Sequence, residues 1–176
     1  MRVLVDMDGV LADFEQGVYN ALCDQYSHIP HIPLEQRTTF HVKAQYPPEH
    51  QSTVEAIYVA KGFYANLSPV AGSLEALTQL REQHDIFICT SPLLKNKHCI
   101  PEKYEWVEKH LGREWLDRVV ITKDKTLVLA DILVDDNPTI EGCEKPTWEH
   151  ILYDQPYNRS VDKRRLTWRN WRDVLC

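Results

Sequence analysis

Five short apolar runs recur along the chain, and they restrict the possible folds more than any other feature of the sequence. The runs are rich in β-branched residues and almost continuously hydrophobic, which is typical of strands buried on both faces of a parallel sheet. They cover residues 3–5, 86–89, 119–121, 132–134 and 151–153. Because helical patterns lie between them, we predict an α/β fold with right-handed crossovers.

The helical patterns are identified by their apolar spacing and by their end signals. One set is Leu74, Leu77 and Leu80, and a second set is Tyr104, Val107 and Leu111. Pro101 suits the first turn of the second helix. Asn137 and Pro138 are typical of a helix cap and first turn, so another helix is expected there. Residues 166–175 are expected to close the fold as a helix or turn packed on the sheet.

About eighty residues separate the first two expected strands, far more than a simple crossover needs. The intervening stretch contains Pro30, Pro33, Pro47 and Pro48, and two helical pieces at 14–26 and 52–61, but little strand pattern. We therefore predict a core of residues 1–14 and 70–176 with a small helical cap, residues 15–69, inserted after the first strand. Such a cap would cover the carboxyl edge of the sheet, where open α/β sheets bind ligands.

Two of the expected strands end in paired acids. Asp6 and Asp8 follow the first strand, and Asp135 and Asp136 follow the fourth. Paired carboxylates repel each other unless one is protonated or a cation lies between them, and Mg²⁺ prefers such oxygen ligands. In one parallel sheet the two pairs would meet at the same edge, which predicts a metal site there. The alternative is two unrelated acidic turns.

Hydroxyl and amine groups follow two other strands. Thr90 and Ser91 come directly after the second strand, and their hydroxyls suit phosphate oxygens. They would equally suit the cap of a following helix. Lys123 and Lys125 follow the third strand, where an amine would neutralise phosphate, although a loop lysine is usually solvated. Only the combination with the acids favours a phosphate site.

The net charge and the cysteine pattern limit the binding partners and the cellular location that we expect. A net charge of −6 disfavours a nucleic-acid polymer, although residues 159–172 interleave basic side chains with tryptophans and leave single-strand binding as an alternative. No apolar run is long enough for a membrane span, and the early first strand leaves no room for a presequence, so the cytosol is expected. Five scattered cysteines without a CxxC pair indicate reduced thiols.

The combined motifs resemble those of the haloacid dehalogenase superfamily: a strand followed by Asp-x-Asp-Gly, a strand followed by threonine, a lysine, and a strand followed by Asp-Asp. Longer strings resemble the animal 5'(3')-deoxyribonucleotidases of the cytosolic and mitochondrial types. These strings are VLVDMDGVLADFE (3–15), PLEQR (33–37), ICTSPLLK (88–95), KYEWVEKHLG (103–112), DKTLV (124–128), WEHIL (148–152) and NWRDVL (170–175).

The resemblance implies a role for each matching residue. Asp6 matches the nucleophile that becomes an aspartyl phosphate and also ligates Mg²⁺. Asp8 matches the general acid and base, with its backbone carbonyl on the metal. Asp136 matches the other metal ligand and Asp135 a supporting residue. The implied phosphate contacts are Thr90, Ser91 and Lys125, and the implied nucleoside pocket is Phe14, Phe40, His41, Val42 and Tyr58.

The resemblance also implies the substrates and the assembly. Deoxyribonucleoside monophosphates with 5', 3' or 2' phosphates are expected, with dUMP and dTMP preferred, as is a homodimer. His41 stands where the family has an apolar or aromatic residue, so the base preference stays open. Lys123 stands where the animal enzymes have arginine, which leaves the substrate contacts open as well. The alternatives are a phosphatase for a ribonucleotide or sugar phosphate, and a non-catalytic phosphoacceptor or ligand-binding protein. Asp8 argues against the latter, because a general acid promotes hydrolysis of a phosphoaspartate.

Overall fold

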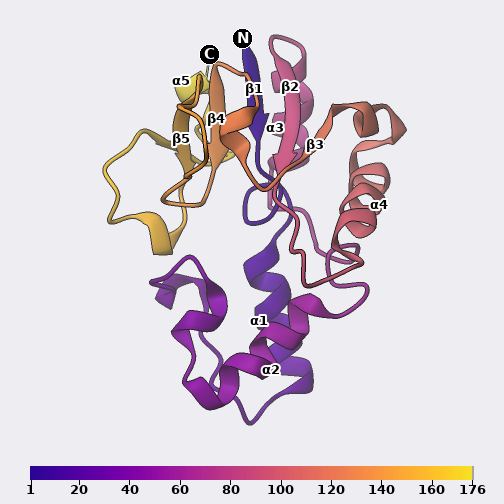
Figure 1. Ribbon diagram of the computed structural model, residues 1–176, viewed down its shortest axis with the longest axis vertical. Helices are drawn as coiled ribbons and strands as arrows, with labels where there is room; N and C mark the ends of the chain where they lie inside the picture. The colour runs from indigo at the N-terminus through magenta and orange to yellow at the C-terminus, as the bar shows by residue number, and fades with distance from the viewer. Residues whose placement is uncertain (176) are drawn as a thin grey trace.

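The computed structural model describes residues 1–175, which form a six-stranded parallel sheet of order β3-β2-β1-β4-β5-β6. The strands are β1 (Arg2–Val5), β2 (Asp85–Thr90), β3 (Val119–Ile121), β4 (Ile132–Asp135), β5 (Glu149–Tyr153) and β6 (Arg165–Leu166). All five expected strands are therefore confirmed (Figure 1). β6 is additional, and its two residues are too few to carry a periodic pattern. The parallel sheet and its helices confirm the predicted α/β class.

The central strands are apolar throughout because both faces of the sheet are covered. Val3 and Val5 of β1 belong to the main core, whereas Leu4 between them belongs to a second cluster with Leu133 and Trp148 on the opposite face. Side chains alternate across a strand, so a three-residue apolar run buries both of its sides. This explains the continuous hydrophobicity of the sequence runs.

Three helices pack on the main-core face: α3 (Ser73–Arg81), α4 (Cys99–Leu111) and α5 (Trp171–Leu175). The leucine spacing of the sequence is confirmed in α3, where Leu77 and Leu80 are buried. The helix expected at Asn137 and Pro138 is wrong. The Asn137 side chain instead accepts a hydrogen bond from the Thr139 amide at 3.1 Å, a local turn that competes with helix formation.

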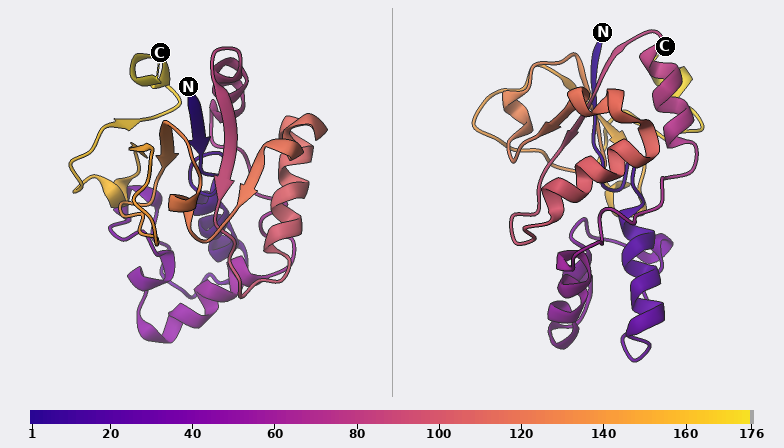
Figure 2. Two further views of the ribbon diagram at one scale, coloured as in Figure 1. Left: turned by 45° about the horizontal axis from the view of Figure 1, so that its top comes forward. Right: turned by 90° about the vertical axis from the view of Figure 1, so that its right-hand side faces the viewer.

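A second body of structure lies beyond the carboxyl ends of the strands. It contains α1 (Phe14–Gln25), α2 (Pro48–Val59) and two short 3₁₀ helices, Leu34–Gln36 and Val42–Gln45. These elements share a hydrophobic cluster of their own, which includes Leu22 of α1 and Val54 of α2. Figures 1 and 2 show α1 and α2 projecting away from the sheet. The cap boundaries at residues 15 and 69 stay a prediction.

The remaining expectations of chain organisation concern thiols and membranes. In the described chain Cys23, Cys89, Cys99 and Cys143 are free thiols. None of the helices between residues 1 and 175 combines the length and the apolar character that crossing a membrane requires.

Candidate active site

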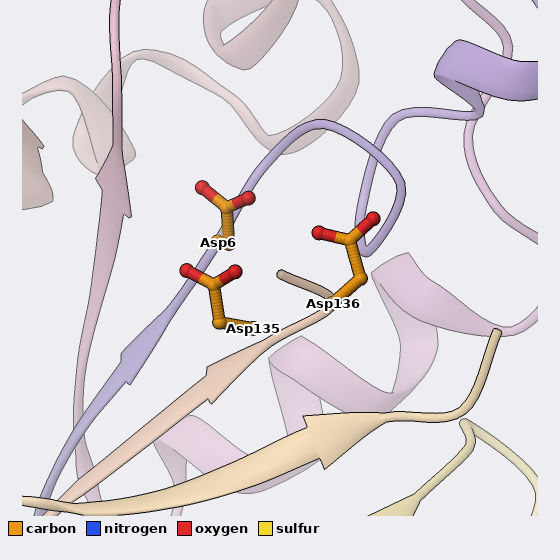
Figure 3. Close-up of side chains that lie close together, drawn as sticks. All are labelled: Asp6, Asp135 and Asp136. Atoms are coloured by element: carbon orange, nitrogen blue, oxygen red, sulfur yellow. The ribbon is translucent and has the colours of Figure 1, made fainter. Parts of the chain in front are cut away.

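Three carboxylates meet at the carboxyl edge of the sheet. The register of β1 on β4 aligns Val5 with Val134, so the residues that follow, Asp6 and Asp135, emerge side by side. Asp136 is one residue further along. One carboxylate oxygen of each acid lies within 4.8 Å of the others, and Figure 3 shows the three side chains gathered around one space. The sheet topology therefore brings the two acid pairs together.

Lys125 lies inside this cluster. Its Nζ donates to Asp6 Oδ1 at 2.7 Å and to Asp135 Oδ2 at 2.5 Å, and its side chain is buried. Burial alone would lower the pKa of Lys125, but Asp135 and Asp6 raise it on balance, so the amine stays protonated. The lysine thus compensates part of the negative charge of the cluster.

The acids retain an excess of negative charge. Burial, reinforced by Asp6, raises the pKa of Asp135 to about 6 even though Lys125 opposes the shift. Burial also raises the pKa of Asp136 well above its usual value, with Asp135 and Asp6 adding to the effect. One lysine does not balance three carboxylates, so their full ionisation calls for a further cation.

The fit of a divalent cation can be tested on Asp136. Its Oδ2 accepts a hydrogen bond from the Tyr157 hydroxyl, whereas its Oδ1 is buried and finds no donor among residues 1–175. A buried carboxylate oxygen without a partner is unfavourable, and a cation would satisfy it. The donor set of Asp6 and Asp136 therefore fits an oxygen-preferring ion such as Mg²⁺.

Asp8 is held by a lysine that the sequence interpretation did not assign to the site. Lys103 of α4 is completely buried, and its Nζ donates to Asp8 Oδ2 and to Thr90 Oγ1, both at 2.7 Å. A signal was present: Lys103 shares the inward face of α4 with Cys99, Trp106 and Val107, where a lysine is unusual.

Asp8 lines the pocket with its side chain a quarter exposed. Removal from bulk water raises its pKa even though the Lys103 ammonium opposes the shift. A raised pKa favours the protonated carboxyl group, which is the form that a general acid needs. The geometry and the electrostatics of Asp8 therefore suit proton transfer at the mouth of the acid cluster.

A pocket of about 500 Å³ opens from the acid cluster toward α1 and α2, a size common for small-molecule sites. The structure places all twelve predicted site residues on its lining: Asp6, Asp8, Phe14, Phe40, His41, Val42, Tyr58, Thr90, Ser91, Lys125, Asp135 and Asp136. Lys123 also lines it. The acid cluster and Lys125 thus lie at the sheet end. The cap contributes aromatic rings such as Phe14 and Tyr58, with centroids 5.6 Å apart, together with the ion pair of Lys43 and Glu55.

The strand arrangement and the acid cluster at its edge define the class: this is the fold of the haloacid dehalogenase-like hydrolases. A family member from Streptococcus pneumoniae aligns with a TM-score of 0.58 at 11% identity, covering 99% of this chain and 98% of its own. A magnesium-bound hydrolase of this class from Bacillus subtilis aligns with a TM-score of 0.60 at 11% identity, covering 99% and 97%. At such identities the likeness concerns the fold.

Within this class, the chain belongs to the family described as "5' nucleotidase, deoxy (Pyrimidine), cytosolic type C protein", whose model matches residues 1–176. The human cytosolic-type 5'(3')-deoxyribonucleotidase is 46% identical, covering 99% of this chain and 93% of its own. The human mitochondrial one is 42% identical, covering 99% and 82%. A Bordetella pertussis protein, named provisionally for the same activity, is 48% identical, covering 100% and 96%. The family expected from the sequence is confirmed.

Proposed function

We propose that the protein is a Mg²⁺-dependent phosphatase that hydrolyses deoxyribonucleoside monophosphates through an aspartyl phosphate on Asp6. The observation that carries the proposal is the two-ended pocket, with acids and a buried lysine at one end and aromatic side chains at the other. The first end suits a phosphate group and the second a nucleoside. The names of the 46% and 42% identical human relatives support the same substrate class.

In the first step, Asp6 attacks phosphorus while the bond between phosphorus and the nucleoside oxygen breaks. Lys125 holds Oδ1 of Asp6, so Oδ2 is the oxygen presented to the phosphate. Asp8 gives its proton to the departing oxygen. Thr90 contributes its hydroxyl hydrogen to a phosphate oxygen, because its own oxygen already accepts from Lys103.

In the second step, Asp8 takes a proton from water, the resulting oxygen forms a bond to phosphorus, and the bond to Asp6 breaks, which restores both carboxyl groups. Asp6 and Asp136, with the Asp8 carbonyl, would hold Mg²⁺, which when bound offsets the negative charge of carboxylate and phosphate. The chain's own contribution is to orient Asp6 through Lys125 and Asp8 through Lys103.

Lys103→Met is expected to lower kcat by about 10²-fold, because Asp8 loses the donor that fixes its Oδ2. KM should change little, since Lys103 does not line the pocket. Steady-state phosphate release at saturating substrate measures the effect. Lys109→Met, on the exposed side of the same helix, is the matched control and should retain full activity. A wild-type kcat in the Lys103 variant would contradict the assigned role.

The nucleoside end of the pocket supports a preference for deoxyribose. Phe14, Phe40 and Tyr58 offer flat apolar faces for the base and sugar. A 2'-hydroxyl buried there without a partner would cost about 1–3 kcal/mol, which is roughly 5- to 150-fold in kcat/KM. dUMP should therefore exceed UMP by that factor at subsaturating concentration. Equal turnover of the two would exclude this explanation of the preference.

The whole proposal is tested by phosphate release from dUMP, dTMP, dGMP, UMP, 3'-UMP and glucose 6-phosphate, with and without Mg²⁺. Mg²⁺-dependent release led by the deoxynucleotides supports it. Release led by glucose 6-phosphate would keep the chemistry and discard the substrate class. Release from none of them would favour the non-catalytic phosphoacceptor instead.

Assembly, location and polymer binding belong to the proposal as well. By family membership we propose a homodimer in the cytosol, because the residues match the cytosolic-type family model. The basic C-terminal stretch gives little support to single-strand binding. Arg159 and Arg165 pair with Asp154, and Arg164 pairs with Glu149, so part of its positive charge is balanced within the protein.

A further inference from the structure

A short segment, residues 155–158, fastens the two acid-bearing loops to each other; we call it the brace. Gln155 Nε2 donates to the Gly9 carbonyl at 2.8 Å, next to Asp8. Asn158 Nδ2 donates to the Asp136 carbonyl, also at 2.8 Å. Both brace side chains are buried. The brace therefore bonds the backbone beside each acid pair.

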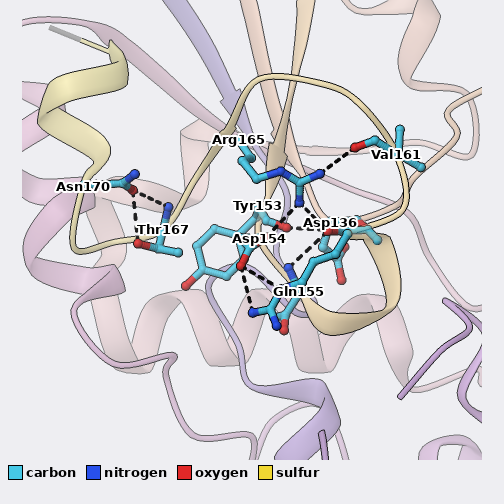
Figure 4. A network of polar contacts seen from close by, with 10 residues as sticks. Asp136, Tyr153, Asp154, Gln155, Val161, Arg165, Thr167 and Asn170 are labelled. Carbon is cyan, nitrogen blue, oxygen red and sulfur yellow. Dashed lines mark hydrogen bonds and ion pairs between the residues drawn. The ribbon is translucent and has the colours of Figure 1, made fainter. Parts of the chain in front are cut away.

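The brace is itself held firmly. Asn158 Nδ2 also donates to the carbonyl of Tyr153, the last residue of β5, at 2.8 Å. Arg165 of β6 binds Asp154 Oδ1 at 2.8 Å and the Val161 carbonyl at 2.6 Å, just outside the brace, as Figure 4 shows. The end of the sheet thus fixes where the brace lies relative to the acid cluster.

Tyr157, within the brace, contacts the acid cluster through Asp136. Its hydroxyl donates to Asp136 Oδ2, and its side chain is buried. Gly9 permits this close approach: its φ is +77°, and a Cβ at this position would meet the Asp136 carboxylate and lie 3.3 Å from the Tyr157 hydroxyl. With Oδ2 occupied, Oδ1 of Asp136 is the oxygen left for a cation.

The ring of Tyr157 touches the cap. Phe40 packs against it edge to face, with ring centroids 6.0 Å apart, and the Arg37 guanidinium lies 5.7 Å from the ring centre. Phe40 lines the pocket and is one of the residues proposed above to receive the nucleoside. Arg37 is buried in an ion pair with Glu15, which lines the pocket as well. Tyr157 therefore contacts Asp136 of the acid cluster and Phe40 of the pocket wall without lining the pocket itself.

We propose that Tyr157 is a positioning residue with two separable tasks: its hydroxyl orients Asp136 toward the cation, and its ring supports the Phe40 wall of the nucleoside pocket. The inference rests on the proposed function, because it assumes that Asp136 ligates Mg²⁺ and that Phe40 faces the nucleoside. Residues that orient a metal ligand commonly change metal affinity 10- to 100-fold when they are removed.

The test uses two variants of the full-length protein and two ligands, Mg²⁺ and deoxyuridine, each measured by calorimetry. Tyr157→Phe removes the hydroxyl and keeps the ring, so the Kd for Mg²⁺ should rise about 10-fold or more while the Kd for deoxyuridine stays within about twofold. Tyr157→Leu removes the ring as well, and deoxyuridine binding should then weaken by a further roughly 2- to 10-fold. Tyr104→Phe, on α4 and away from the pocket lining, should alter neither.

The results distinguish the task of the Tyr157 hydroxyl from the task of its ring. Wild-type Mg²⁺ affinity in Tyr157→Phe would overturn the task assigned to the hydroxyl. Equal deoxyuridine affinity in the phenylalanine and leucine variants would overturn the task assigned to the ring. If circular dichroism shows that the leucine variant does not fold, Tyr157→Met replaces it. Failure of the unmutated protein to bind Mg²⁺ would overturn the proposed function and this inference with it.

Discussion

Asp6→Asn is expected to abolish Mg²⁺-dependent phosphate release, with a loss on the order of 10⁴-fold or more, as when one member of a catalytic unit is removed. The amide is nearly the same size as the carboxylate, so the pocket keeps its shape. It is a far poorer nucleophile, however, and it removes the negative charge that Asp6 offers to a cation. It also replaces a charged partner of Lys125, whose Nζ lies 2.7 Å from Asp6 Oδ1.

The measurement is phosphate release from dUMP in saturating Mg²⁺, together with a search for phosphorylated protein by mass spectrometry in the wild type. Asp117→Asn, an exposed acid outside the pocket, is the matched control and should keep full activity. An Asp6→Asn variant with more than about one per cent of wild-type kcat would refute the covalent mechanism, since the remaining residues would then suffice for chemistry.

Lys125→Met is expected to lower the free energy of unfolding by about 3–5 kcal/mol in the absence of Mg²⁺, the usual effect of removing one partner from a buried ionic group. Methionine fills a similar volume, so little is lost in packing. The loss arises because Asp6 and Asp135 stay buried without the ammonium that binds both of them, at 2.7 and 2.5 Å. Urea denaturation measures the change.

Lys123→Met provides the control, because Lys123 is exposed two residues earlier in the same loop; its effect should stay within about 0.5 kcal/mol. Mg²⁺ should restore part of the lost stability to the Lys125 variant, since an ion that binds only the folded state favours folding. Unchanged stability in Lys125→Met would show that the acid cluster is neutralised in some other way, for instance by protonation.

The sequence by itself determined the sheet and the position of its reactive edge. Because β1 and β4 are buried on both faces, their apolar runs appear as continuous hydrophobic stretches, and the acids that end those runs can only lie at the carboxyl edge of a parallel sheet. The long strings around Asp6 and Lys125 placed the chain in its family. Local sequence patterns were less reliable where a side chain can form more than one kind of local hydrogen bond. Asn137, for example, forms a turn instead of a helix cap.

The tertiary structure alone decided how the acids are held. Lys103 is 95 positions from Asp8, and Tyr157 is 21 positions from Asp136, so no local pattern links either pair. Both side chains reach the site because α4 packs on the main core and the brace crosses the end of the sheet. Hydrogen bonds between distant segments depend on how whole elements pack, so the sequence did not reveal them. Strand burial and acid spacing are properties of neighbouring residues, so the sequence did reveal those.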